Sequence, residues 1–191
     1  MFTSRPKVTM TPQLIKQAEV KHFANLCRTQ WMVDHIRNDK VIDREFVKNI
    51  VTTEGLNSLL NIMFKSGTQI TSWYILIFEN DYTPLATDTY ASPGWTETIA
   101  YDETTRPQWV GGTVASGSVD NSASKATFTM NATKTIYGGA IVGGGTLPST
   151  KNNTGGGGTA YAAVKFTSSK AVVATDVIKI TATISASDDA S

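Results

Sequence analysis

The sequence is short of the residues on which most catalytic and metal sites depend. Its 191 residues include one cysteine and two histidines. A single cysteine excludes an intrachain disulfide, and without a Cys/His cluster there is no zinc-site spacing. Neither His22 nor His35 has the Ser, Cys or Asp context of a catalytic triad motif. We therefore expect no catalytic residue, no metal and no cofactor.

Long apolar runs and strong charge are also missing. No run approaches the length of a membrane-spanning helix, and residues 1–7 lack the apolar core of a secretory signal, so we expect cytoplasmic synthesis and no membrane partner. Residues 1–50 hold nine Lys/Arg against five Asp/Glu, and residues 51–191 hold eight against eleven. The basic residues are scattered and have no aromatic residues interleaved, which gives no support for a nucleic-acid partner.

The N-terminal region carries an apolar stripe that needs a partner. Residues 1–10 predict an extended arm, and Thr11 followed by Pro12 is a typical helix start. Apolar residues then recur at helical spacing over roughly four turns. Because an isolated helix of this length is marginal in water, the stripe requires either the body of the chain or a neighbouring subunit. We predict a partner-binding clamp formed by Leu14, Ile15, Lys16, Lys21, Phe23, Leu26, Arg28 and Trp31.

A β-hairpin and a second helix follow this arm. Residues 31–36 and 41–47 flank the polar turn 37–40, and this pattern predicts a hairpin. Thr52 or Thr53 then provides a helix cap, and Gly67 ends the helix. We expect this helix to pack against the strand that comes after it. Its apolar face consists of Leu56, Leu59, Leu60, Met63 and Phe64.

From residue 73 onward the pattern is that of short strands separated by turn residues. The expected strands span residues 73–78, 95–101, 126–130, 135–142, 160–166 and 177–184. Strands at this spacing, without helices between them, predict a mainly β fold: an antiparallel β-sandwich that is jelly-roll-like or immunoglobulin-like. We divide the chain into a docking region, residues 1–50, and a body of helix plus sandwich, residues 51–191.

Two loops invite a chemical interpretation. The loop at 143–158 is rich in glycine but lacks the Gly-Lys-Ser/Thr ending of a phosphate-binding loop, so we expect a mobile hairpin loop that projects from the body. Between residues 79 and 103, several carboxylates could form a glycosidase pair or a calcium cage, but their spacing is not diagnostic of either. We favour solvated loop charges, with Arg106 paired to one of them. The carboxylates are Asp81, Asp88, Glu97, Asp102 and Glu103.

An ordered set of short motifs runs through the body of the chain. The motifs are VTTEGLNSLL (51–60), TSWY (71–74), LATDT (85–89), GWTE (94–97), Tyr101, RP (106–107) and DNSASKA (120–126). This set resembles a widespread group of virion proteins of tailed bacteriophages. The resemblance covers residues 47–187 and leaves out residues 1–30. It implies a structural protein encoded among the virion genes, but no particular position on the particle.

We therefore expect a non-enzymatic virion protein, first of all a capsid cement or decoration protein. It would bind the major capsid protein or other virion proteins, form a homo-oligomer and stabilise the head. The same clamp would also suit a head-to-tail adaptor, a tail component or a fibre-attachment component. A different class is a glycan-binding module for host adhesion that uses Trp95 and Asp88. In the structural roles no small-molecule substrate is expected, and the protein would be made in the host cytoplasm and end in the virion.

Overall fold

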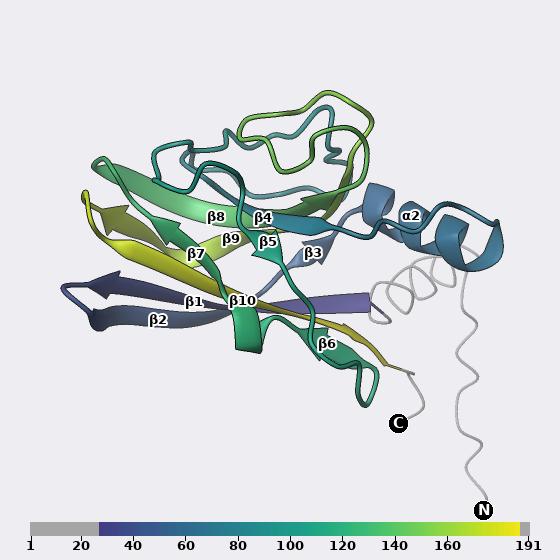
Figure 1. The fold of residues 1–191 in the computed structure, drawn as a ribbon, viewed down its shortest axis with the longest axis horizontal. Helices are drawn as coiled ribbons and strands as arrows, with labels where there is room; N and C mark the ends of the chain where they lie inside the picture. The colour runs from purple at the N-terminus through teal and green to yellow at the C-terminus, as the bar shows by residue number, and fades with distance from the viewer. Residues whose placement is uncertain (1–26, 188–191) are drawn as a thin grey trace, which may run out of the picture.

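The computed structural model describes residues 27–187 of the chain. Within this range the protein forms two antiparallel five-stranded sheets, one α-helix and one short 3-10 helix, Ser122–Ser124 (Figure 1). The predicted mainly β fold with antiparallel pairing and an internal helix is therefore confirmed. No helix among these residues is both long and apolar enough to span a membrane.

The first sheet, sheet A, joins the start of the described chain to its end. Its strands are β1 (Cys27–Arg37), β2 (Lys40–Lys48), β6 (Ser118–Asp120), β7 (Ala126–Thr129) and β10 (Val177–Ala186). Strands β1 and β2 form the predicted hairpin, in which Asn38 and Asp39 both take the left-handed conformation that suits a tight turn. Strand β1 pairs with β10 from Cys27↔Ala186 to Ile36↔Val177. The hairpin is thus an integral part of sheet A, and the predicted regions 1–50 and 51–191 share this sheet.

The second sheet, sheet B, has the strand order β3-β9-β8-β4-β5. Its strands are β3 (Ile50–Val51), β4 (Trp73–Phe78), β5 (Gln108–Trp109), β8 (Lys134–Gly143) and β9 (Thr159–Val172). The central pair β8–β9 is a long hairpin whose connecting loop contains residues 144–158. Figure 1 shows sheets A and B as two layers, with long loops on the side of sheet B that faces away from sheet A.

Strand β4 is covered on both faces, which explains its continuous apolar sequence. Ile75 and Ile77 belong to the core between the two sheets, where residues of β1, β7 and β10 meet those of β8 and β9. Leu76 and Phe78 point the other way, into a second apolar cluster with Trp95 under the outer loops. Two cores of different construction therefore lie on either side of sheet B.

The predicted strand at 95–101 is wrong. The structure has only isolated bridges in this segment, Phe78↔Glu97 and Tyr101↔Met130. The side chains that gave the apparent alternation serve the outer loop layer instead, because the ring of Trp95 stacks on Phe78 and the carboxylate of Glu97 binds an arginine. The short strands β5 and β6 were not predicted, since two or three residues carry no periodicity.

The predicted internal helix is confirmed as α2 (Thr53–Phe64), but its packing differs from the expectation. Thr52 caps it by accepting a hydrogen bond from the amide of Gly55 at 2.9 Å. The first turn packs on β9, where a side chain on Gly55 would collide with the backbone of Tyr161. The rest of the helix extends beyond the sheets (Figure 1), so much of its apolar face remains exposed.

Candidate functional site

The outer loops are joined by one buried arginine, Arg106. Its side chain is 1% exposed, and its Nε and Nη2 donate to the two carboxylate oxygens of Glu97 at 2.9 and 2.5 Å. Nη1 donates to the carbonyl of Pro148 and to the hydroxyl of Tyr90, at 2.9 and 3.3 Å, and Nη2 also donates to the carbonyl of Asn153 at 2.9 Å. With five such bonds, the donors of the guanidinium are used.

This ion pair holds the glycine-rich loop against the body. The amide of Asn152 donates to the carboxylate of Glu97 at 2.9 Å, and Lys151 donates to the carbonyl of Tyr101 at 2.7 Å. Burial acts to lower the pKa of Arg106, but the hydrogen bonds and the charge of Glu97 outweigh it and hold that pKa above its ordinary value. The predicted pairing of Arg106 with a nearby carboxylate is confirmed. The loop folds back over sheet B rather than projecting from it.

The other carboxylates of this region divide into buried and exposed groups. Asp88 accepts from the hydroxyl of Tyr82 at 2.9 Å and from the amide of Leu85 at 2.8 Å, so it closes a local turn. Both Asp88 and Glu97 are buried, and for them the expectation of solvated charges is wrong. Asp81 fits that expectation, since it pairs with Lys165 at the surface. Among residues 27–187, no three His, Cys, Asp or Glu side chains form a group suited to a metal ion.

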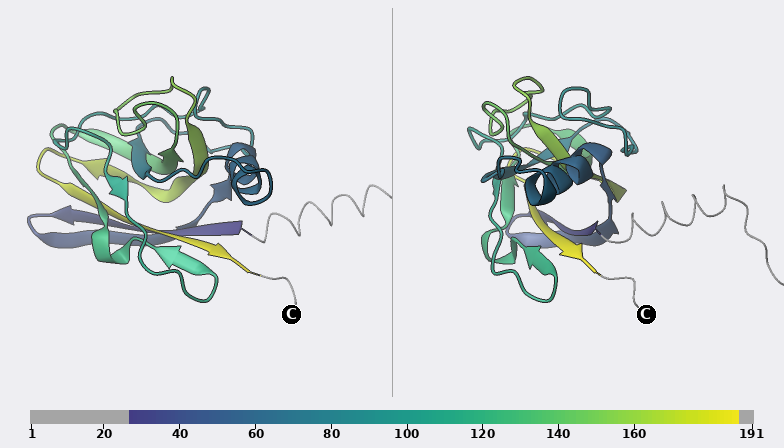
Figure 2. Two further views of the ribbon diagram at one scale, coloured as in Figure 1. Left: turned by 45° about the vertical axis from the view of Figure 1, so that its right-hand side comes forward. Right: turned by 90° about the vertical axis from the view of Figure 1, so that its right-hand side faces the viewer.

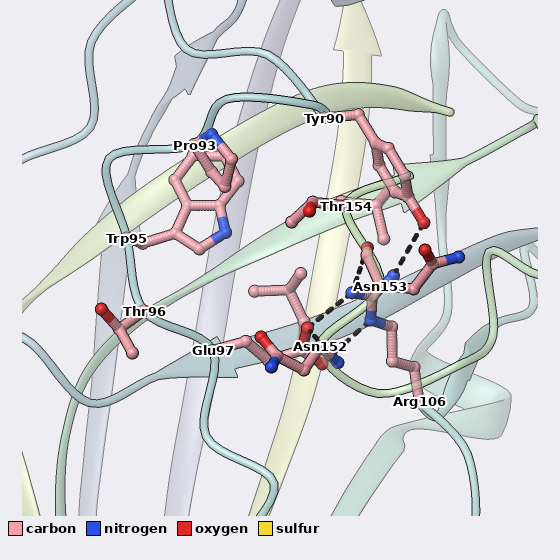
Figure 3. Close-up of a pocket in the computed structure, with 11 residues that line it drawn as sticks. Tyr90, Pro93, Trp95, Thr96, Glu97, Arg106, Asn152, Asn153 and Thr154 are labelled. Atoms are coloured by element: carbon pink, nitrogen blue, oxygen red, sulfur yellow. Dashed lines mark hydrogen bonds and ion pairs between the residues drawn. The ribbon is translucent and has the colours of Figure 1, made fainter. Parts of the chain in front are cut away.

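Beside the ion pair lies a cavity of about 190 Å³ (Figure 3). Leu76 and Val142 of sheet B line it, and Tyr90, Pro93 and Trp95 line it from the outer loop. The ion pair of Arg106 and Glu97 also lines the cavity. The remaining lining residues are Thr96 and three residues of the glycine-rich loop, Asn152, Asn153 and Thr154. Trp95 and Glu97 were singled out from the sequence, whereas Tyr90 and residues 152–154 were not, because only the folded loops bring them together.

Most of the predicted clamp lies outside the described residues. This applies to Leu14, Ile15, Lys16, Lys21, Phe23 and Leu26. Arg28 is exposed on β1. Trp31 is fully buried between the sheets, and its indole Nε1 donates to the hydroxyl of Thr29 at 3.1 Å. Its prediction as a partner contact is therefore wrong: alternation along β1 turns it inward, in register with Ala182 of β10.

His35 lies on the hairpin, as expected, and takes part in a buried polar cluster. Its Nε2 is 2.8 Å from Oδ2 of Asp176, and Arg37 donates to both oxygens of that carboxylate at 2.8 and 2.7 Å. The hydrogen bonds from Arg37 hold the pKa of Asp176 well below its ordinary value, against the opposing effect of burial, and His35 adds to the lowering. The cluster ties the start of β10 to β1.

Two elements each carry several exposed apolar side chains close together in the sequence. In the second half of α2, Met63 and Phe64 are 67% and 76% exposed, and Leu59 and Leu60 are 38% exposed each. On β2, which lies at the edge of sheet A, Phe46 is 63% exposed, and Val41 and Ile42 are about half exposed. We call the first group the α2 face. Figure 2 shows α2 beside the two sheets.

A scan against protein-family models and a search of curated proteins both found no match to this chain.

Proposed function

We propose that this chain is a non-enzymatic structural protein of a tailed-bacteriophage particle, and that it binds the outside of the capsid as a cement or decoration protein. The ordered motifs between residues 47 and 187 support a place among virion proteins. The buried charges support a structural role, since Arg106, Glu97 and Asp88 hold loops together. The partner would be the major capsid protein or another virion protein, and further copies of the chain would complete a homo-oligomer.

The observation that carries this proposal is the α2 face. Four large apolar side chains, Leu59, Leu60, Met63 and Phe64, lie exposed on little more than one turn and a half of the helix. Full burial of one such side chain contributes about 1.5–3 kcal/mol, so a partner surface that covers them would gain affinity without any chemistry. On a symmetric shell the same contact repeats with every copy, and linked copies would hold one another in place.

We also propose that the two facing sheets are a β-sandwich of the jelly-roll-like type. The strand pairing is nested, because β1 pairs with β10, β3 with β9, and β4 with β8. In the immunoglobulin-like alternative the first and last strands belong to different sheets. Here the first and last strands of the described chain are neighbours in sheet A, which favours the jelly-roll-like arrangement.

The proposal is tested by rebinding to particles that lack the protein. The full chain should bind and raise the temperature at which the heads open. The variant Phe64→Glu should bind at least about tenfold more weakly, because a charge in a covered apolar contact is costly. Thr104→Glu adds the same charge at an exposed position outside α2, and it should bind normally. Equal binding of both variants would contradict a role for the α2 face.

Deletion of residues 1–26 tests the predicted clamp separately. The deletion should end at residue 26 because Cys27 and the following residues pair with β10, and removing them would damage sheet A. The truncated chain should remain folded by circular dichroism but fail to join particles. Normal joining would contradict the clamp.

The closest structural alternatives are a head-to-tail adaptor, a tail component and a fibre-attachment component. These would use the same apolar surfaces but occupy few positions per particle. From a different class, a glycan-binding module for host adhesion is favoured only by the cavity beside Trp95.

A further inference from the structure

One donor in the outer loop layer has no partner. The indole of Trp95 is only 6% exposed, and its ring stacks on Phe78 with 6.2 Å between centroids. Its Nε1 donates to no residue among 27–187, whereas the indoles of Trp31 and Trp109 donate to Thr29 and Ala182 at 3.1 and 2.9 Å. In Figure 3 the indole nitrogen lies on the side of the ring that faces Thr154 and Asn153. The nitrogen is not enclosed by protein atoms, so its N–H is free to donate to a molecule in the cavity.

Apart from Arg106, Glu97 and Asn153, whose side chains are bonded within the protein, the polar side chains of the cavity are neutral and have bonding capacity left. The hydroxyl of Tyr90 accepts from Arg106 but donates to none of the described residues. The side chains of Thr96, Asn152 and Thr154 line the cavity without a hydrogen bond to the described chain. With Trp95, they present hydrogen-bond donors and acceptors above an apolar floor. This combination suits a ligand that has hydroxyl groups and one apolar face.

The charged groups of the cavity are not available to a ligand. Arg106 uses its donors within the protein, and Glu97 accepts from Arg106 and from the amide of Asn152. A charged ligand would have to break this pair and leave a buried charge without a partner, which is strongly unfavourable. The cavity, at about 190 Å³, is below the size range of typical drug-sized sites. It is therefore suited to a small neutral molecule.

We propose that this cavity binds a single neutral pyranose, such as the terminal sugar of a glycan. The indole N–H of Trp95 and the hydroxyl of Tyr90 would donate to sugar oxygens. The hydroxyl of Thr154 and the amide of Asn152 would contact the sugar at the rim. The apolar face of the ring would lie against Pro93, which is more exposed than Leu76 and Val142. This assignment can fail independently of the particle proposal. A capsid protein that binds no sugar would rebind to particles but give no shift with glycosides, and a sugar-binding protein that joins no capsid would do the reverse.

The test is a titration of the full chain with methyl glycosides of glucose, mannose, galactose and N-acetylglucosamine, followed by NMR of the indole N–H signals. Trp95→Phe identifies the Trp95 signal. At least one glycoside should shift this signal saturably, with a Kd on the order of millimolar for a ligand of this size. The signals of Trp31 and Trp109 should not move, because both donors are bonded within the protein.

Two matched variants of the glycine-rich loop complete the experiment. Thr154→Val removes a hydroxyl that lines the cavity and should weaken binding about fivefold, whereas Thr150→Val removes an exposed hydroxyl of the same loop outside the cavity and should leave binding unchanged. No shift of the Trp95 signal with any glycoside would overturn the proposal. A shift that Thr154→Val leaves unchanged, or one produced by acetate or phosphate rather than by sugars, would overturn it as well.

Discussion

The two sides of sheet B are stabilised in different ways. Between sheets A and B, the contacts are apolar side chains that alternate along paired strands, and eighteen buried residues form this core. On the outer side only eight buried residues form the apolar cluster, and the loops above it are held by buried charges such as Arg106 and Glu97. The inner core therefore spreads its stability over many similar contacts, whereas the outer layer concentrates it in a few polar ones.

The polar construction of the outer layer follows from its backbone. Loops that cover a sheet have amides and carbonyls without a strand partner, and these groups need hydrogen bonds when they are buried. Arg106 donates to two such carbonyls, those of Pro148 and Asn153, and Glu54 accepts from the amides of Tyr90 and Ala160 at 2.8 and 2.6 Å. A single charged side chain thus organises several backbone segments. Loss of one such side chain should loosen the loops and leave the sheets paired.

The largest expected effect comes from the inner core. Trp31→Ala removes a fully buried ring between the sheets, and it should lower the free energy of unfolding by about 3–5 kcal/mol. Urea unfolding, followed by circular dichroism, measures this loss. Phe46→Ala removes an exposed ring from β2 and should change the free energy by less than about 0.5 kcal/mol. Similar losses in the two variants would contradict the assignment of Trp31 to the core.

The next effect should come from the buried ion pair. Arg106→Met leaves the carboxylate of Glu97 buried without its cation, and it should cost about 3 kcal/mol. Hydrogen exchange should speed up across residues 144–158 but remain slow in β1 and β10. Lys165→Met breaks the exposed pair with Asp81 and should cost at most about 1 kcal/mol. If Arg106→Met sped up hydrogen exchange in the loop and in the sheets alike, the outer layer would not open independently of the sheets.

A smaller effect is expected at Glu54, which joins α2 to the loop layer and to β9. Glu54→Gln keeps the shape but removes the charge from an oxygen that accepts two amides. The expected cost is about 1–2 kcal/mol, measured by urea unfolding. Glu79→Gln, which alters the surface pair with Lys134, is the matched control and should have almost no effect. Equal losses would contradict the role of Glu54.

The smallest effect is a dependence on pH that belongs to the sheets rather than to the loops. The pKa of Asp176 is lowered by its hydrogen bonds from Arg37 and His35, so the folded state binds a proton at this group less readily than the unfolded state. Its contribution to stability is therefore complete above about pH 4 and is lost as the pH falls through the lowered pKa. Asp176→Asn should flatten the acid limb of stability against pH, and Asp39→Asn in the exposed turn should not. If the stability of Asp176→Asn fell with decreasing pH as steeply as that of the unchanged protein, other groups would cause the acid sensitivity.

Much of the fold could be predicted from the sequence because the signals for most strands and for the helix lie within short stretches of the chain. The apolar run of β4, the turn at Asn38 and Asp39 and the Thr52 cap all depend on nearby residues. The segment 95–101 was misassigned because Trp95 and Glu97 alternate as in a strand but contact Phe78 and Arg106 rather than a partner strand. Trp31 was misassigned because its spacing fits either a contact surface or the inward face of a strand.

The candidate site was much less predictable than the fold. The sequence drew attention to Trp95 and Arg106, but the cavity also requires residues 152–154, which reach it only when the glycine-rich loop folds back. Its glycines serve that fold: Gly156 and Gly157 take positive φ, and a side chain on Gly158 would collide with the ring of Tyr90. A glycine run of this kind therefore indicates close packing of a loop as readily as a phosphate site.

The central claim, that this chain is a repeated component of a phage capsid surface, is tested most directly by its copy number in purified particles. Quantitative mass spectrometry against the major capsid protein should find on the order of hundreds of copies per particle, as expected for a site repeated by the symmetry of the shell. About a dozen copies or fewer would contradict the decoration role and favour the neck or tail. Absence of the chain from washed particles would contradict the structural proposal as a whole.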